Sequence, residues 1–91
     1  FFKLAHAYEM NGNLNEAIKY YEYSDKIGFG DKKLLYNNLG NIYLKLDKLD
    51  RSEDYFLKAL NLDKNNKIIT NNLLRNYLRA RNYGKVEIYI K

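Results

Sequence analysis

The 91-residue chain has no cysteine, no proline and a single histidine. Without cysteine it can form neither a disulfide framework nor a thiolate metal site. The absence of proline, together with only five glycines, argues against collagen-like, linker-like and turn-dense all-β chains. No apolar run reaches the ~18 residues typical of a membrane-spanning helix. With 46% hydrophobic and 30% charged residues, the composition instead fits an ordinary globular domain.

The start of the chain and its charge distribution bear on its context. It begins Phe1-Phe2-Lys3, with neither an initiator methionine nor a signal-peptide pattern, so we expect a piece of a longer protein. The lack of cysteine and of glycosylation sequons is compatible with a cytoplasmic location. The net charge of +5 is uneven, because residues 1–31 carry three basic and five acidic side chains whereas residues 67–91 carry six and one. A basic C-terminal quarter suits an acidic partner or nucleic acid.

The sequence repeats itself at a spacing of 34 to 35 residues. Side chains of similar size recur at this spacing, as in Leu4, Leu39 and Leu73, in Tyr8, Tyr43 and Tyr77, and in Tyr21, Phe56 and Ile90. Within one unit the apolar residues step by three or four, which is the period of an α-helix. The pattern predicts six helices, over about residues 1–11, 14–28, 32–46, 49–62, 66–80 and 83–91.

Short polar breaks separate the predicted helices and supply N-terminal caps. Asn13 followed by Glu16 has the spacing of a capping box, in which each side chain bonds a backbone N–H near the other. Asp31 stands in the equivalent place before the third predicted helix, and Asn65-Asn66 stand before the fifth. We therefore expect these side chains to accept hydrogen bonds from the first turn of the helix that follows.

A helix-turn-helix unit of about 34 residues with these side chains resembles the tetratricopeptide repeat. The middle unit carries the motif most fully, as Tyr36, Leu39-Gly40, Tyr43, Ser52, Phe56 and Ala59. The resemblance implies an all-α, tetratricopeptide-like helix-turn-helix solenoid of about two and a half repeats, forming a right-handed superhelical fragment. We expect a single domain over residues 1–91, with units at about 1–31, 32–65 and 66–91, the last of them incomplete.

Small residues indicate where the paired helices approach each other. Gly40 should lie against Ser52 in the second unit, and Ala5 and Ala17 should serve the same purpose in the first. The third unit places Leu74 and Val86 where small residues are expected, so its helix pair should be splayed or shifted.

Few residues are available for catalysis. Ser24 and Ser52 fall on packing positions of the repeat, which disfavours a nucleophile. His6 is alone, and no carboxylate pair stands beside it at metal-ligand spacing. Gly28-Phe29-Gly30 lacks the rest of a phosphate-loop signature and fits a turn between units. We therefore expect no enzyme activity, no small-molecule substrate, no metal and no cofactor.

The resemblance also implies a binding surface. In tetratricopeptide arrays the outward face of each first helix lines a concave groove that binds extended peptides or partner helices. Asparagine suits such a groove because its amide offers donors and an acceptor to a peptide backbone. The alternative is that the asparagines reflect a codon bias of the genome. The candidate groove residues are Asn37, Asn38, Asn41, Lys45, Asn71, Asn72, Arg75 and Arg79, and the same face also includes His6 and Leu44.

Three other functions can be compared with the sequence: two fit it less well, and one remains an alternative to peptide binding. The family's carboxylate clamp requires five groove residues, and its first possible placement matches only Asn38. A placement one unit later matches Asn41 and Asn72 but lacks the lysine at Asn37. Nucleic-acid binding is disfavoured because Tyr77 and Tyr83 fall on core positions of the repeat rather than on an open stacking surface. A structural role remains open, in which the chain is a self-associating or spacer segment of a protein whose active domain lies elsewhere.

Overall fold

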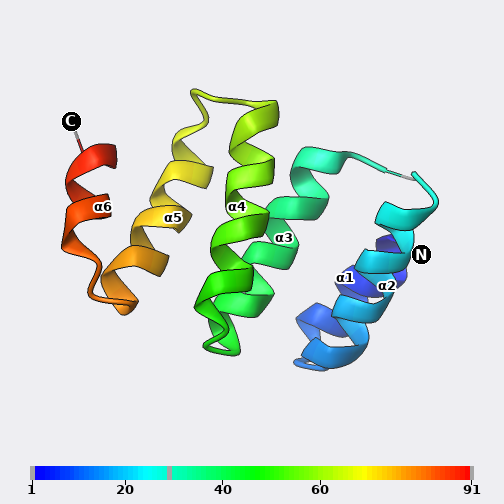
Figure 1. The fold of residues 1–91 in the computed structure, drawn as a ribbon. Helices are drawn as coiled ribbons and strands as arrows, with labels where there is room; N and C mark the ends of the chain where they lie inside the picture. Colours follow the sequence, from blue (N-terminus) through cyan, green and yellow to red (C-terminus); the bar gives the residue numbers. More distant parts are fainter. Residues whose placement is uncertain (1, 29, 91) are drawn as a thin grey trace.

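The computed structural model describes residues 2–28 and 30–90, and within these residues it contains six α-helices and no strand. The helices are α1 (Phe2–Met10), α2 (Leu14–Lys26), α3 (Lys32–Lys45), α4 (Leu49–Leu62), α5 (Lys67–Arg79) and α6 (Tyr83–Tyr89). They follow one another across the molecule as three helical pairs, α1–α2, α3–α4 and α5–α6, in a body of 37 × 24 × 18 Å (Figure 1). The predicted all-α solenoid is confirmed, and no helix boundary differs from its prediction by more than two residues.

The predicted caps are confirmed before the third and fifth helices but not before the second. Asp31 accepts hydrogen bonds from the backbone N–H groups of Lys33 and Leu34, and Asn66 accepts one from Ile69. Asn13 precedes α2, but its side chain accepts no such bond, so the capping-box prediction is wrong.

The turn inside each pair has the same backbone geometry in all three pairs. Asn13, Lys48 and Asn82 each donate their backbone N–H to the carbonyl five residues earlier, at 2.9, 2.9 and 2.8 Å respectively. The residues before them, which have positive φ, are Gly12, Asp47 and Arg81. This is the Schellman arrangement that ends one helix and turns the chain directly into the next.

The second pair is the most closely packed. A Cβ added to Gly40 would lie 2.5 Å from the ring of Phe56, and Ser52 Oγ donates to Gly40 O at 2.8 Å. Ala5 and Ala17 are fully buried between α1 and α2, as expected. The third pair has half-buried Leu74 and Val86 in the corresponding places, and α5 and α6 make the least extensive contact of the three pairs.

The buried side chains form two clusters, and α3 contributes to both. The first cluster joins α1, α2 and α3 through Ala5, Ala17, Tyr21, Leu35, Leu39, Ile42 and Tyr43. The second joins α3, α4 and α5 through Leu44, Phe56, Ala59, Ile69, Leu73 and Tyr77.

Two sequence predictions about burial are wrong, and a third residue is more exposed than its repeat equivalent. Leu44, expected on the outward face, is only 8% exposed because α5 packs over it. Tyr83, expected at a core position, is 60% exposed, and Leu4, which aligns with the buried Leu39, is 43% exposed. These two residues lie on α1 and α6, each of which packs mainly against one neighbouring helix, so one side of each helix stays uncovered.

Candidate functional site

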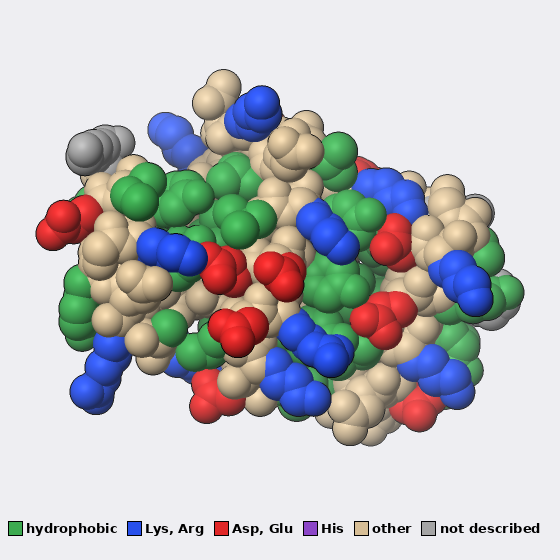
Figure 2. Space-filling model, viewed as in Figure 1, with side chains coloured by type: hydrophobic (Ala, Val, Ile, Leu, Met, Phe, Trp, Pro, Cys, Tyr) green, Lys and Arg blue, Asp and Glu red, His purple; other side chains and the backbone are tan. Residues whose placement is uncertain are grey.

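The molecule has two faces of different character. We call the outward surface of α1, α3 and α5 the first-helix face, and that of α2, α4 and α6 the second-helix face. In Figure 1, α2 and α4 stand nearer the viewer than α1 and α3, so this view looks onto the second-helix face. Figure 2 shows that acidic and basic side chains intermingle there over an apolar background. The candidate groove residues all lie on α3 and α5, two of the helices that form the first-helix face.

Two hydrogen bonds hold α3 and α5 side by side. Asn72 Nδ2 donates to Asn37 Oδ1 at 2.8 Å, and Arg79 Nη1 donates to Leu44 O at 2.6 Å. Both bonds join residues 35 positions apart, and they lie two helical turns from each other along both helices. The two helices therefore run parallel in a fixed register, and the side chains between the bonds are held on one surface.

Asn72 is not the open ligand that the sequence predicted. It is only 6% exposed, and its amide is used in the bond to half-buried Asn37. A buried amide is costly unless it is hydrogen-bonded, and two facing asparagines satisfy each other. This pair is a cross-link between neighbouring units, so the expectation of an accessible Asn72 is wrong.

Two more candidate residues are partly engaged within the chain. Arg79 donates a hydrogen bond to a carbonyl at the end of α3, and its guanidinium lies 3.5 Å from Asp47 Oδ1. A cation is favoured there because the C-terminal end of a helix carries partial negative charge. Asn38 Nδ2 donates to Tyr21 Oη at 3.3 Å. The side chains of the remaining four candidates form no hydrogen bond or ion pair with the described residues: Asn41, Lys45, Asn71 and Arg75.

Tyr21 is the centre of a polar network that the sequence did not reveal. Its side chain is buried, and its hydroxyl donates to Glu9 Oε1 at 2.8 Å and lies 3.5 Å from Nδ1 of the exposed His6. Burial raises the pKa of Tyr21, and the nearby Glu9 carboxylate raises it further, so the hydroxyl stays neutral. With Asn38 the network joins α1, α2 and α3. The sequence held one indication of this network. Tyr21 stands where the next unit has Phe56, and its additional hydroxyl needs a hydrogen-bond partner.

A repeated tyrosine pair, also missed by the sequence analysis, joins the two helices of each helical pair. One tyrosine of a first helix stacks on one of the following helix, with ring centroids 5.6 Å apart in Tyr8–Tyr20, 5.7 Å in Tyr43–Tyr55 and 5.9 Å in Tyr77–Tyr89. Two of these hydroxyls, of Tyr43 and Tyr55, donate to Glu22 Oε2 at 3.2 and 3.1 Å. The sequence does contain this pattern, since tyrosines recur 12 residues apart in all three units.

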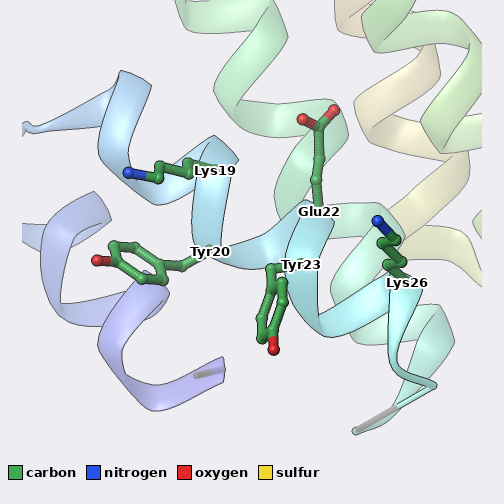
Figure 3. Close-up of a pocket in the computed structure, with 5 residues that line it drawn as sticks. All are labelled: Lys19, Tyr20, Glu22, Tyr23 and Lys26. Atoms are coloured by element: carbon green, nitrogen blue, oxygen red, sulfur yellow. The ribbon is translucent and has the colours of Figure 1, made fainter.

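A depression of about 450 Å³ on the second-helix face is a weaker candidate. Its lining consists of Lys19, Tyr20, Glu22, Tyr23 and Lys26. All five residues belong to α2, and Figure 3 shows their side chains fanning out in different directions rather than converging on one point. The depression therefore offers no set of groups aimed at a common ligand atom.

The described residues do not assemble a metal centre. No group of three histidine, cysteine, aspartate or glutamate side chains lies close enough in them to hold a metal ion. Among the helices that the structure describes, none combines the length and apolar character needed to cross a membrane.

Comparison with known proteins agrees with the architecture. Two family models, each described as a tetratricopeptide repeat, match residues 34–66 and residues 1–27. These ranges contain nearly all of the second and first helical pairs. No curated protein sequence matches the chain. The helical pairs, the turn that they share and the two matches together show that the chain belongs to the tetratricopeptide repeat family.

Proposed function

We propose that the chain is a non-catalytic interaction module whose first-helix face binds an extended peptide or a partner helix. Repeats of this family generally mediate protein–protein interaction. The observation that carries the proposal is the surface between the two α3–α5 hydrogen bonds. It presents Asn41 and Arg75, and Asn71 lies next to it, one residue before Asn72 on α5. The polar side-chain groups of these three residues are not used within the described part of the chain.

The fixed register of α3 and α5 supports binding on physical grounds. A site that is already ordered loses little conformational entropy when a ligand arrives. Amide side chains at regular spacing can pair with both the N–H and C=O groups of an extended backbone, whatever the side chains of that peptide are. The first-helix face therefore combines a rigid support with groups suited to peptide recognition.

The experiment is a display selection of random peptides on the immobilised chain, followed by affinity measurements on the selected peptides. The double variant Asn41→Ala/Asn71→Ala should weaken their binding by about tenfold, the loss expected for one or two hydrogen bonds. The matched control is Asn15→Ala/Asn61→Ala, which removes two exposed asparagines from α2 and α4 and should leave binding unchanged. Equal effects of the two double variants, or no selected peptide, would contradict the proposal.

Self-association is the second candidate function, favoured by the apolar surface of α6. Tyr83, Ile88 and Ile90 at this end of the described chain are all more than half exposed. Apolar patches of this kind often mark contact with another protein surface. Sedimentation over a wide range of protein concentration tests this function, because a species that stays monomeric throughout would exclude it.

A further inference from the structure

The charges of the chain are divided between its two faces. The segments of α3 and α5 contain three lysines or arginines each and no aspartate or glutamate. The carboxylates lie instead on α2, α4 and α6 and in the turns, apart from Glu9 on α1. The side chain of Glu9 is only 12% exposed and accepts the hydrogen bond of Tyr21. Accessible carboxylates are therefore nearly absent from the first-helix face.

Ion pairs inside the chain use some of these cations but not all of them. Lys32 pairs with Asp25, and Lys33 Nζ lies 3.3 Å from Asp63 Oδ2. Arg79 is shared between Leu44 O and Asp47, which is exposed at the edge of the face. Lys45 and Arg75 have no carboxylate partner among the described residues. The C-terminal half of the first-helix face thus has a cationic strip formed by Lys45, Arg75 and Arg79.

The N-terminal half of the same face is apolar. Leu34 and Ile68 occupy equivalent positions of α3 and α5, and they are 44% and 66% exposed. Leu34 and Lys45 are separated by 11 residues, which brings them back to the same side of a helix, about 16 Å apart. Ile68 and Arg79 have the same separation, and Arg75 lies one turn closer to Ile68. An extended peptide covers such a distance in about three to five residues.

From this arrangement, and resting on the proposed function, we infer that the first-helix face selects an extended acidic peptide with a bulky apolar side chain. The apolar side chain packs on Leu34 and Ile68. The carboxylates, about three to five residues away, pair with the cationic strip of Lys45, Arg75 and Arg79. Asn41 and Asn71, between the two ends, hold the peptide backbone.

A nucleic acid is also an anion, but the surface favours a peptide. Bases bound without sequence preference stack on exposed aromatic rings beside cations. The tyrosines of each stacked pair are instead packed against each other between the two helices of a pair, where Tyr43 and Tyr77 are buried. Neutral amides lie beside the cationic strip, and an exposed leucine and isoleucine occupy the other half of the face, which matches a peptide better than a chain of phosphates.

The test is fluorescence anisotropy with short labelled synthetic peptides and the whole chain. The first peptide has a phenylalanine followed, about four positions later, by two glutamates. The second has glutamines in place of the glutamates and should bind about tenfold more weakly, the value of one charge-assisted hydrogen bond. A third peptide, with the glutamates next to the phenylalanine, should also bind more weakly because it cannot reach both ends of the face.

Variants of the protein show whether the charge acts at this site. Arg75→Glu should weaken binding of the acidic peptide by about tenfold or more and reduce its dependence on salt. Lys26→Glu on α2, labelled in Figure 3, changes the net charge equally on the second-helix face and should alter affinity by less than about twofold. Circular dichroism checks that both variants keep the helical fold.

The outcomes separate this inference from the proposed function. If the glutamine peptide binds as tightly as the acidic one, while Asn41→Ala/Asn71→Ala still weakens both, the acidic preference is wrong and the binding face stands. If no first-helix variant changes peptide binding, both proposals fail. Tighter binding of a labelled single-stranded oligonucleotide than of the acidic peptide would also overturn the inference.

Discussion

Ser24 is a buried residue whose polar group is left unused. Its Oγ has no hydrogen-bond partner within the described part of the chain, whereas Ser52 Oγ donates to Gly40 O at 2.8 Å. The repeat aligns Ser24 with Ala59, which is equally buried. The hydroxyl of Ser24 therefore loses its hydration on folding without gaining a bond, while the hydroxyl of Ser52 is compensated.

Replacing Ser24 by alanine should therefore stabilise the protein. We expect Ser24→Ala to raise the free energy of unfolding by up to about 1 kcal/mol, because an unsatisfied buried group is removed at nearly constant volume. Ser52→Ala, the matched control, should lower the free energy of unfolding by about 1 kcal/mol, since it removes the side-chain hydrogen bond to Gly40 O. Urea denaturation measures both, and a loss of stability in Ser24→Ala would contradict this account.

The individual asparagines also show how far the sequence can predict the candidate site. Asn71 and Asn72 are neighbours on one side of α5, and the 34-to-35-residue repeat does not decide which of them faces α3. That choice depends on how α5 packs against α3, which is a tertiary property. The structure makes Asn72 the cross-link and leaves Asn71 exposed. The helix face was thus predictable, but the division between structural and available amides was not.

At the scale of secondary-structure elements, the turns inside the three helical pairs share one backbone conformation but differ in sequence. The residue with positive φ is Gly12 in the first turn, Asp47 in the second and Arg81 in the third. Glycine adopts this conformation freely, whereas a residue with a Cβ atom is strained by it. Glycine at position 12 indicates such a turn from the sequence alone. The sequence did not indicate that the other two turns have the same geometry.

Exchanging the residues at these equivalent positions should have opposite effects. Arg81→Gly should stabilise the protein by about 0.5–1 kcal/mol because it relieves the backbone strain at this position. The greater freedom of glycine in the unfolded chain offsets part of this gain. Gly12→Ala should destabilise it by about 1 kcal/mol, although nothing lies within 4 Å of the added methyl group. Thermal denaturation of the two variants gives the comparison, and shifts of the same sign would refute the strain argument.

Glu53 joins three helices and makes their packing depend on pH. Although its partial burial acts in the opposite direction, hydrogen bonds from Lys85 on α6 and Tyr77 on α5 hold the pKa of this α4 carboxyl below its ordinary value of 4.5. A carboxyl with a lowered pKa in the folded state stabilises the protein above its unfolded pKa. That stability is lost as the pH falls through the folded value.

Glu53→Gln should therefore reduce the loss of stability in acid. Wild-type protein should lose free energy of unfolding as the pH falls below 4.5, and the variant should lose less over the same range. Denaturation curves at several pH values measure the difference. Glu87→Gln, an exposed carboxylate on α6, is the control and should follow the wild-type curve. Identical pH profiles for wild type and Glu53→Gln would count against a role for this junction.

At the scale of the whole molecule, equivalent residues differ because their neighbours differ. Leu39 on α3 is fully buried between two helical pairs, while Leu4, one repeat earlier on α1, is 43% exposed. In a linear array each unit contacts only the units next to it, so a residue's burial depends on its place in the stack. The repeat pattern predicted the helices and the fold but could not assign equal burial to equivalent positions.

Truncating these two leucines should separate the effect of position from that of residue type. Leu39→Ala should lower the free energy of unfolding by about 2–5 kcal/mol, the range for large-to-small changes in a packed core. Leu4→Ala should cost about 1 kcal/mol or less, because much of its surface is already hydrated. Urea denaturation compares them directly, and equal costs would show that α1 is covered more fully than the structure indicates.

The two hydrogen bonds between α3 and α5 have a mechanical consequence. One repeat earlier, the corresponding residue pairs are Phe2 with Asn38 and Glu9 with Lys45. Phe2 offers no amide, Asn38 donates to Tyr21 Oη instead, and Lys45 forms no such bond within the described part of the chain. The second and third helical pairs are therefore braced across the first-helix face, while the joint between the first and second pairs is not braced in this way. When a force bends the array, the first helical pair should rotate relative to the second at the α2–α3 joint. The helices α3 and α5 should then move together as one rigid unit.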